Sequence, residues 1–190
     1  MSKTFFHELA KRALATLPPE DRFTPEDAAL LQSEKDYLLG LGEGLVQAFY
    51  DSLFAHPPTR EVFQEGERPA REETLRSWWR RTVEGPFDEA YWAWQAYVGL
   101  LHVRRKVTNT MMWGHAGLVA RYVGAQALSA GKPALAEAAQ RLMATVGAVI
   151  GEAYQEVYLE VLAEATGQSR ALIEANVKVA IEEVTGGRPL

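Results

Sequence analysis

The sequence lacks cysteine altogether. Disulfide bonds, thiolate-bound metals and cysteine nucleophiles are therefore excluded. Positive charge is also in short supply, since the 190 residues carry a formal net charge of −5, which argues against nucleic acid or an anionic membrane as the main partner. The longest largely apolar run, 142–151, lies between Arg141 and Glu152 and is too short to span a bilayer. The first residues also lack the apolar core of a signal peptide, so we expect a cytoplasmic protein.

Several catalytic motifs are missing as well. The sequence has no glycine-rich phosphate loop, no His-x-x-x-His or His-Glu-x-x-His pair and no Gly-x-Ser-x-Gly turn. The acidic pairs at 72–73 and 182–183 are interpreted as solvated helix faces rather than catalytic carboxylates. No enzymatic function is therefore indicated by these motifs.

What the sequence does contain is helical periodicity almost throughout, with 47% hydrophobic residues, enough for one domain with a single core. The pattern predicts helices over 2–16, 24–55, 59–64, 70–84, 109–130, 133–165 and 169–184, and a further helix around His102. Within 24–55, Gly40, Gly42 and Gly44 indicate a break or a close helix crossing. The start at Thr24-Pro25 is strong because a threonine cap precedes a first-turn proline and acidic residues. Helices of such uneven length favour an all-α, globin-like fold over a symmetrical bundle.

His102 is the most informative residue. Six residues recur at three- and four-residue steps and share one helical face: Tyr91, Trp94, Gln95, Val98, Gly99 and His102. Gly99 lies one turn before the histidine and removes a neighbouring side chain, so that a flat ligand could approach the imidazole. These are the requirements of an axial ligand to haem iron. The alternative from spacing alone is a core histidine bonded to a backbone carbonyl.

A second aromatic face precedes it in the chain. Apolar residues repeat at helical spacing over the segment Val46, Phe49, Tyr50, Leu53 and Phe54. Most of this face is ordinary core, but the Tyr50 hydroxyl needs a hydrogen-bond partner when buried. That partner is either a bound ligand or a neighbouring carbonyl.

Taken in order, these segments make the chain similar to the protoglobins and to the sensor domains of globin-coupled sensors, over roughly 23–167. The segments that carry the resemblance are Phe23-Thr24-Pro25-Glu26-Asp27, Ala48-Phe49-Tyr50-Asp51, His56-Pro57, Val62-Phe63, Trp78, Phe87-Asp88-Glu89-Ala90-Tyr91-Trp92 and Gln95 to Arg104. The resemblance implies a haem cofactor, His102 as the proximal ligand of the iron and Tyr50 in the distal pocket. It also implies a domain at 23–167, with an extra N-terminal helix in 1–22 and an extra C-terminal helix in 168–190.

The chain departs from the family at two distal positions. Phe49-Tyr50 stands where a Trp-Tyr pair is common, and Leu75 stands where phenylalanine is common. Both changes keep the pocket apolar but leave its preference among gases open. The residues expected to hold the haem are Phe49, Tyr50, Leu53, Leu75, Trp78, Trp79, Tyr91, Trp94, Val98, Gly99, His102 and Arg105.

Other basic and histidine residues have simpler interpretations. The basic segment 104–106, which includes Arg105, could meet haem propionates, although positive residues also gather at the negative end of a helix. His115 is interpreted as a packing or surface residue rather than a second axial ligand.

The last two globin helices, 109–130 and 133–165, predict an oligomer. The second has an apolar side and an opposite side of small residues, Ala144, Gly147, Ala148 and Gly151, which would allow another helix to approach closely. In the resembling family these helices pair into a dimeric four-helix bundle, so we expect a homodimer. The alternative is a helix buried wholly within its own subunit.

Three functions remain in order of preference. The first is a haem-binding globin that reversibly binds O2, CO or NO, as a sensor or a single-domain protoglobin. The second is a haemless globin-fold interaction module, in which His102 is only a packed side chain. The third is a haem enzyme such as an NO dioxygenase or a peroxidase, for which no reductase segment or distal histidine–arginine pair is evident.

Overall fold

The computed structural model describes residues 1–186, and within them it contains α-helices and no strands. The helices are α1 (Lys3–Thr16), α2 (Pro25–Ser33), α3 (Lys35–Gly40), α4 (Gly42–Ala55), α5 (Pro57–Arg60), α6 (Arg68–Glu84), α7 (Glu89–Arg104), α8 (Asn109–Ser129), α9 (Pro133–Thr166) and α10 (Arg170–Thr185). The fold is all-α and globin-like, as the sequence predicted.

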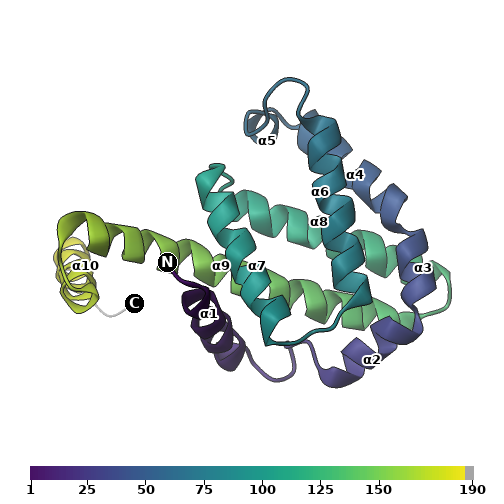
Figure 1. The fold of residues 1–190 in the computed structure, drawn as a ribbon, viewed down its shortest axis with the longest axis horizontal. Helices are drawn as coiled ribbons and strands as arrows, with labels where there is room; N and C mark the ends of the chain where they lie inside the picture. Colours follow the sequence, from purple (N-terminus) through teal and green to yellow (C-terminus); the bar gives the residue numbers. More distant parts are fainter. Residues whose placement is uncertain (187–190) are drawn as a thin grey trace.

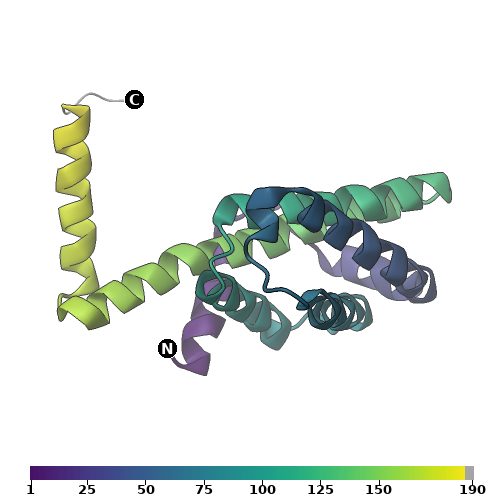
Figure 2. The same ribbon diagram turned by 90° about the horizontal axis from the view of Figure 1, so that it is seen from above.

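Two layers of helices make up the body of the molecule. The long helices α8 and α9 pack against each other, α6 and α7 cross in front of them, and α4 contacts both α6 and α8 (Figure 1). The same two layers are visible from above (Figure 2). Crossed rather than parallel helices leave room between the layers, and this arrangement positions the site described below.

The core is built around α9. Residues at helical spacing along its inner face, including Val146, Val149 and Ala153, are almost fully buried. This burial follows from the uncharged stretch 142–151, because a helix that is apolar on more than one side must be covered on more than one side. Among its neighbours α9 contacts α1, α2, α7 and α8.

The N-terminal helix α1 belongs to this core. Ser2 caps the helix by accepting a hydrogen bond from the backbone N–H of Phe5. Leu9, Ala10 and Ala13 are buried against α7 and α9. The helix is therefore packed on the globin-like body rather than separate from it.

The predicted start of α2 is confirmed in detail. Thr24 and Asp27 form a capping box, in which each side chain binds the backbone N–H of the other residue. The Asp27 carboxylate also accepts two hydrogen bonds from Arg141 of α9, at 2.6 and 2.8 Å. Because of this Arg141 pair, the pKa of Asp27 is held below its usual value despite burial. A helix-capping residue thus ties α2 to the central helix.

The segment expected as one interrupted helix over 24–55 is three helices. The chain bends at Glu34 and again at Leu41, between Gly40 and Gly42. At the second bend Gly42 has no side chain, and this allows α4 to pass close to α6, because a Cβ there would lie 3.2 Å from the Trp79 ring. The expected helical turn at 59–64 is displaced to 57–60, because Pro57 suits the first position of a helix.

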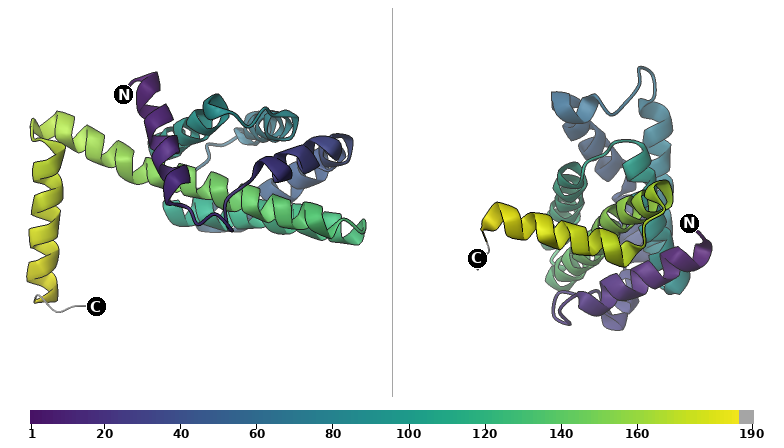
Figure 3. Two further views of the ribbon diagram at one scale, coloured as in Figure 1. Left: turned by 90° about the horizontal axis from the view of Figure 1, so that it is seen from below. Right: turned by 90° about the vertical axis from the view of Figure 1, so that its left-hand side faces the viewer.

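The C-terminal helix α10 projects from the end of α9 (Figure 2 and Figure 3). It contacts the rest of the described chain through α9, and Ile173 is its one buried residue within 1–186. Arg170 binds Glu156 through both of its terminal nitrogens, and Arg12 of α1 binds the same carboxylate at 2.6 Å. Within 1–186 no helix is both long and apolar enough for a transmembrane span.

Candidate functional site

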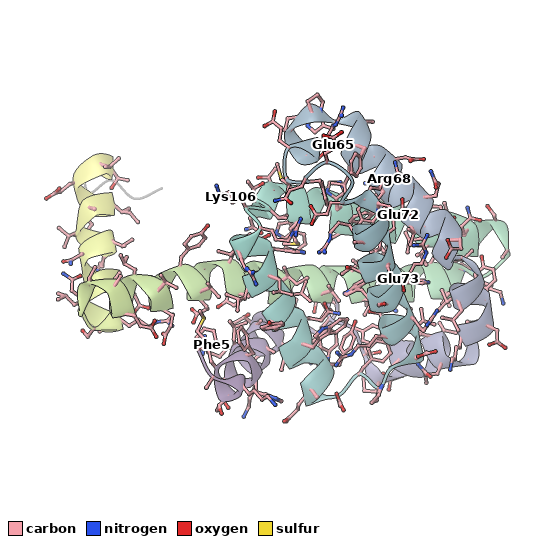
Figure 4. The ribbon with its side chains drawn as sticks, turned by 45° about the horizontal axis from the view of Figure 1, so that its top comes forward. Phe5, Glu65, Arg68, Glu72, Glu73 and Lys106 are labelled. Atoms are coloured by element: carbon pink, nitrogen blue, oxygen red, sulfur yellow. The ribbon has the colours of Figure 1, made fainter. Side chains whose placement is uncertain are left out.

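A cavity of about 1220 Å³ lies between the two layers of helices. This volume exceeds the range of roughly 300–1,000 Å³ that is usual for small-molecule sites. Its walls come from α4, α6, α7, α8 and α9, and from the loop after α5. Figure 4 labels two of its lining residues, Lys106 at the end of α7 and Glu73 on α6.

Most of the predicted site residues line this cavity. Three helices contribute them, as follows: Phe49, Tyr50 and Leu53 from α4, Leu75 and Trp78 from α6, and Trp94, Val98, His102 and Arg105 from α7 and its end. The lining is largely apolar and aromatic, with charged residues such as Glu67, Arg71 and Arg105 among it. Segments far apart in the sequence therefore meet at one cavity.

Trp79, Tyr91 and Gly99 lie outside the lining, contrary to the sequence-based prediction. Trp79 turns into the core, where its indole N–H donates to the Leu38 carbonyl at 3.0 Å. Tyr91 is almost fully buried, and its hydroxyl pairs with that of Thr82 at 3.2 Å. As expected for consecutive tryptophans, Trp78 takes the other direction and faces the cavity.

Gly99 serves a helix crossing rather than an approach to the imidazole. A Cβ on this residue would lie 2.6 Å from the Cβ of Ala153 and 2.8 Å from the carbonyl oxygen of Ile150. Such distances are too short for any side chain, so the missing Cβ lets α7 and α9 touch backbone to backbone. The prediction that Gly99 opens space beside His102 for a ligand is therefore wrong.

His102 lies in the last turn of α7, and hydrogen bonds at the C-terminal end of this helix determine the conformation of that turn. Lys106 adopts a left-handed conformation with φ of 60°. The backbone N–H of Val107 donates to the His102 carbonyl, and that of Lys106 donates to the Val103 carbonyl, both at 3.0 Å. This pair of bonds is a Schellman motif, which fixes the last turn of the helix and with it the position of the imidazole.

The His102 ring is held in its neutral form. Burial, with a smaller contribution from the Arg105 charge, lowers its pKa to about 4. Its Nδ1 is shut off from solvent and has no hydrogen-bond partner within residues 1–186, so the carbonyl-bonded core histidine is not what is observed. The ring lines the cavity, which leaves Nε2 as the nitrogen available to a ligand there.

Tyr50 already has a hydrogen-bond partner. Its hydroxyl donates to the backbone carbonyl of Arg71 on α6 at 2.7 Å. Burial raises the pKa of its phenol to about 12, so the group is a hydrogen-bond donor and not an anion at neutral pH. Phe49 and Phe63 contact the ring edge to face. The sequence left two partners open for the Tyr50 hydroxyl, a bound ligand or a neighbouring carbonyl, and in this structure the partner is the carbonyl of Arg71.

Polar contacts join α6 and α7 on either side of the cavity. At the His102 end, Arg105 binds Glu67 at 2.7 Å. Further along, the Trp78 indole donates to Gln95 at 3.2 Å, and the Arg81 guanidinium stacks 3.9 Å above the Trp94 ring. Arg105, which was expected to meet the haem propionates, is thus paired with the Glu67 carboxylate.

Several lining residues escaped the sequence analysis. His115 was interpreted as packing or surface, and the structure places it in the lining, with Nδ1 2.7 Å from the Met111 carbonyl and its ring against Phe49. The back of the cavity is formed by residues of α8 and α9, namely Met112, Ala116, Val119, Met143, Val146 and Ile150. Their apolar spacing predicted burial, but no local signal distinguishes a cavity wall from solid core.

An all-α array with a large cavity between crossed helices is a globin-like fold. The comparison with family models makes the class more specific, because the Protoglobin model matches residues 22–163. The chain belongs to the protoglobin family. The match begins just before α2 and ends within the last turns of α9, so α1 and α10 lie outside it. No curated protein matches the chain.

Proposed function

We propose that this protein is a haem-binding globin that reversibly binds a diatomic gas, O2, CO or NO. The observation that carries the proposal is the orientation of His102. Its Nδ1 is buried away from solvent, and its ring lines a cavity of about 1220 Å³. A neutral imidazole with one nitrogen free is the ligand that haem iron requires.

The residues around the cavity suit a flat group with an apolar centre and an acidic edge. Trp94 and Val98 would contact one face beside His102, while Phe49, Leu53, Leu75 and Trp78 would contact the other. Arg105 and Arg71 are two of the cations in the lining and would pair with propionates, as Arg105 now pairs with Glu67. Haem would supply the iron to which a gas molecule binds.

Tyr50 is the donor that can discriminate among gases. Bound O2 carries partial negative charge, so a phenol hydrogen bond stabilises it more than CO, by about 1 kcal/mol or more. The Tyr50 hydroxyl would have to leave the Arg71 carbonyl to make that bond. The preference for O2 over CO is therefore set by the difference in free energy between the Tyr50 bond to O2 and the Tyr50 bond to the Arg71 carbonyl.

The direct experiment is an absorbance spectrum of the purified protein after haem reconstitution, in the ferrous state with and without CO. A Soret band that shifts with CO is expected, together with its loss or displacement in His102→Ala. The matched control is His115→Ala, since this histidine lines the same cavity but its Nδ1 contacts the Met111 carbonyl.

The same spectrum tests the two other functions. Absence of a Soret band would reject the proposal and favour a haemless interaction module. A haem enzyme, such as an NO dioxygenase or a peroxidase, would be indicated by turnover of NO or peroxide with an added reductant.

We propose further that the protein forms a homodimer through α8 and α9. Support comes from the exposure of Trp113 (45%) and Leu128 (60%) on α8 and from the partial exposure of Ala144 and Ala148 on α9. The Trp113 ring covers Gly147 within the same chain, which corrects the expectation that this glycine is free to meet another helix.

Light scattering tests the dimer. The wild type should have twice the chain mass, and Ala148→Glu should reduce it to the monomer. The control Lys11→Glu, on the exposed side of α1, should leave the mass unchanged. A monomeric wild type at micromolar concentration would reject the dimer and favour a helix buried within its own subunit.

A further inference from the structure

We infer that Tyr154 is the positioning residue of His102, because its phenol oxygen accepts the hydrogen bond that the imidazole donates from Nδ1. This inference deepens the proposed function and rests on it only in giving His102 the role of iron ligand. Tyr154 lies on α9, 52 positions beyond the histidine in the sequence. Nothing in the local sequence pattern connects the two residues.

The α7–α9 crossing brings the two side chains together. At this crossing Gly99 touches Ala153 and Ile150, as described above. His102 follows Gly99 by one helical turn, and Tyr154 directly follows Ala153. The two rings are in edge-to-face contact, with centroids 6.3 Å apart and planes inclined at 60°.

Both partners carry a buried polar atom that is otherwise unused. Nδ1 of His102 and the hydroxyl of Tyr154 are each shut off from solvent and lack a hydrogen-bond partner among the described residues. An unpaired buried donor or acceptor costs about 1–3 kcal/mol, and such atoms are rare in folded proteins. Because these two atoms belong to rings in edge-to-face contact, each is the nearest available partner that we assign to the other.

The bond is donated from Nδ1 when Nε2 is the metal-binding nitrogen, because a neutral imidazole carries its one proton on the other nitrogen. A neutral imidazole donates from one nitrogen and accepts at the other, and a phenol oxygen can accept. Burial of Tyr154 raises its pKa, so it stays a neutral phenol rather than a competing anion. With the proton held on Nδ1, the lone pair of His102 is on Nε2, which faces the cavity.

The functional consequence concerns the strength of the metal bond. An acceptor on the outer nitrogen of a ligating histidine fixes the ring orientation and makes the imidazole a better donor. Removing such a partner typically weakens metal binding by about 10–100-fold. A neutral phenol is a weaker acceptor than a carboxylate, so we expect the lower end of that range.

The first test needs no haem. Long-range ¹H–¹⁵N spectra of the ¹⁵N-labelled, haem-free protein at neutral pH report which ring nitrogen of His102 carries the proton. We expect the Nδ1–H form in the wild type and a shift towards the Nε2–H form in Tyr154→Phe. Tyr158→Phe is the matched control, because it removes a phenol one turn further along α9 from a residue that is 61% exposed.

The second test uses the reconstituted protein. In Tyr154→Phe the iron–histidine stretching frequency of the ferrous form should fall, and haem should dissociate about 10-fold faster, whereas Tyr158→Phe should match the wild type. A purely structural role of Tyr154 would change stability without moving that frequency.

The outcomes separate this inference from the proposed function. A tautomer shift in Tyr154→Phe, together with the absence of a Soret band in the reconstituted wild type, would support the His102–Tyr154 bond and reject haem binding. Identical imidazole spectra and stretching frequencies in the wild type and Tyr154→Phe would overturn the inference while haem binding stood. If Tyr154→Phe fails to fold, the wild-type spectrum still tests the inference, since a His102 ring in the Nε2–H form cannot donate a hydrogen bond from Nδ1 to Tyr154.

Discussion

Gly99 of α7 and Ala153 of α9 touch so closely that a Cβ on the glycine would lie 2.6 Å from the Cβ of the alanine. This contact determines what stands behind His102, because it sets how closely the cavity-lining helix approaches the central helix. One edge of the His102 ring therefore lines the cavity, while the ring also contacts Tyr154 of α9.

Gly99→Ala should lower the free energy of unfolding by about 1–3 kcal/mol, because an added methyl group overlaps α9 and the backbones must separate. Denaturant unfolding of the haem-free protein measures the loss. Gly124→Ala in α8 is the control, since an added Cβ there meets nothing within 4 Å. That control should be neutral or stabilising by up to about 1 kcal/mol, through helix propensity. Equal effects of the two substitutions would contradict the proposed role of Gly99.

Asp27→Asn should lower the free energy of unfolding by about 2–3 kcal/mol at pH 7, because it leaves Arg141 without its buried carboxylate. The control Glu137→Gln removes the exposed carboxylate 3.9 Å from Arg141 and should change stability by less than about 0.5 kcal/mol.

The same pair predicts a pH dependence. The pKa of Asp27 in the folded protein lies below its ordinary value of 3.8, so the unfolded chain binds the proton more readily. The stabilisation is complete well above pH 3.8 and is lost as the pH falls through that value and below it. Acid unfolding curves of the wild type and Asp27→Asn should therefore converge at low pH, and parallel curves would contradict this assignment.

Tyr50→Phe should destabilise the haem-free protein by about 1 kcal/mol, since it removes the bond to the Arg71 carbonyl between α4 and α6. In the haem-loaded protein the same substitution should speed O2 dissociation more than CO dissociation. Flash photolysis or stopped-flow mixing measures both rates. Tyr37→Phe is the control, because the Tyr37 hydroxyl makes no hydrogen bond within residues 1–186. Unchanged O2 and CO rates in Tyr50→Phe would exclude the phenol as the discriminating donor.

Lys106→Gly should raise the free energy of unfolding by up to about 1 kcal/mol, because glycine adopts the left-handed conformation at the end of α7 without steric strain. Lys106→Ala removes the same side chain but keeps the strained conformation, so it should not stabilise the protein. Thermal unfolding of the two variants distinguishes them. Stabilisation by both would indicate that the lysine charge, not the backbone, is unfavourable.

Local signals in the sequence were enough to predict most of the helix ends and part of the cavity lining. The Thr24–Asp27 capping box and the first-turn Pro25 act within one turn, so the sequence showed where α2 begins. Similarly, Trp94, Val98 and His102 share one side of α7 because helical spacing places them there, and all three line the cavity. The family resemblance over this region agrees with the Protoglobin match at 22–163.

The errors concern residues on helices that are covered on several sides. Tyr91 and Gly99 are buried on α7 along with Trp92, Ala93, Gln95 and Ala96, so the helix has apolar contacts nearly all round. Spacing groups such residues by face but does not say which neighbouring helix each face meets. Trp79 was misplaced for the same reason, since either of two adjacent indoles on α6 could have faced the cavity.

The sequence by itself determined an all-α chain, the ends of most of its helices and the placing of an imidazole and a phenol on two apolar helical faces, because these depend on interactions within a few residues. Only the tertiary structure decided that Gly99 meets α9, that the Tyr50 hydroxyl is bonded to the Arg71 carbonyl and that Tyr154 stands behind His102. Those contacts depend on how each helix is rotated and crossed against its neighbours. That rotation is set by the packing of the whole core.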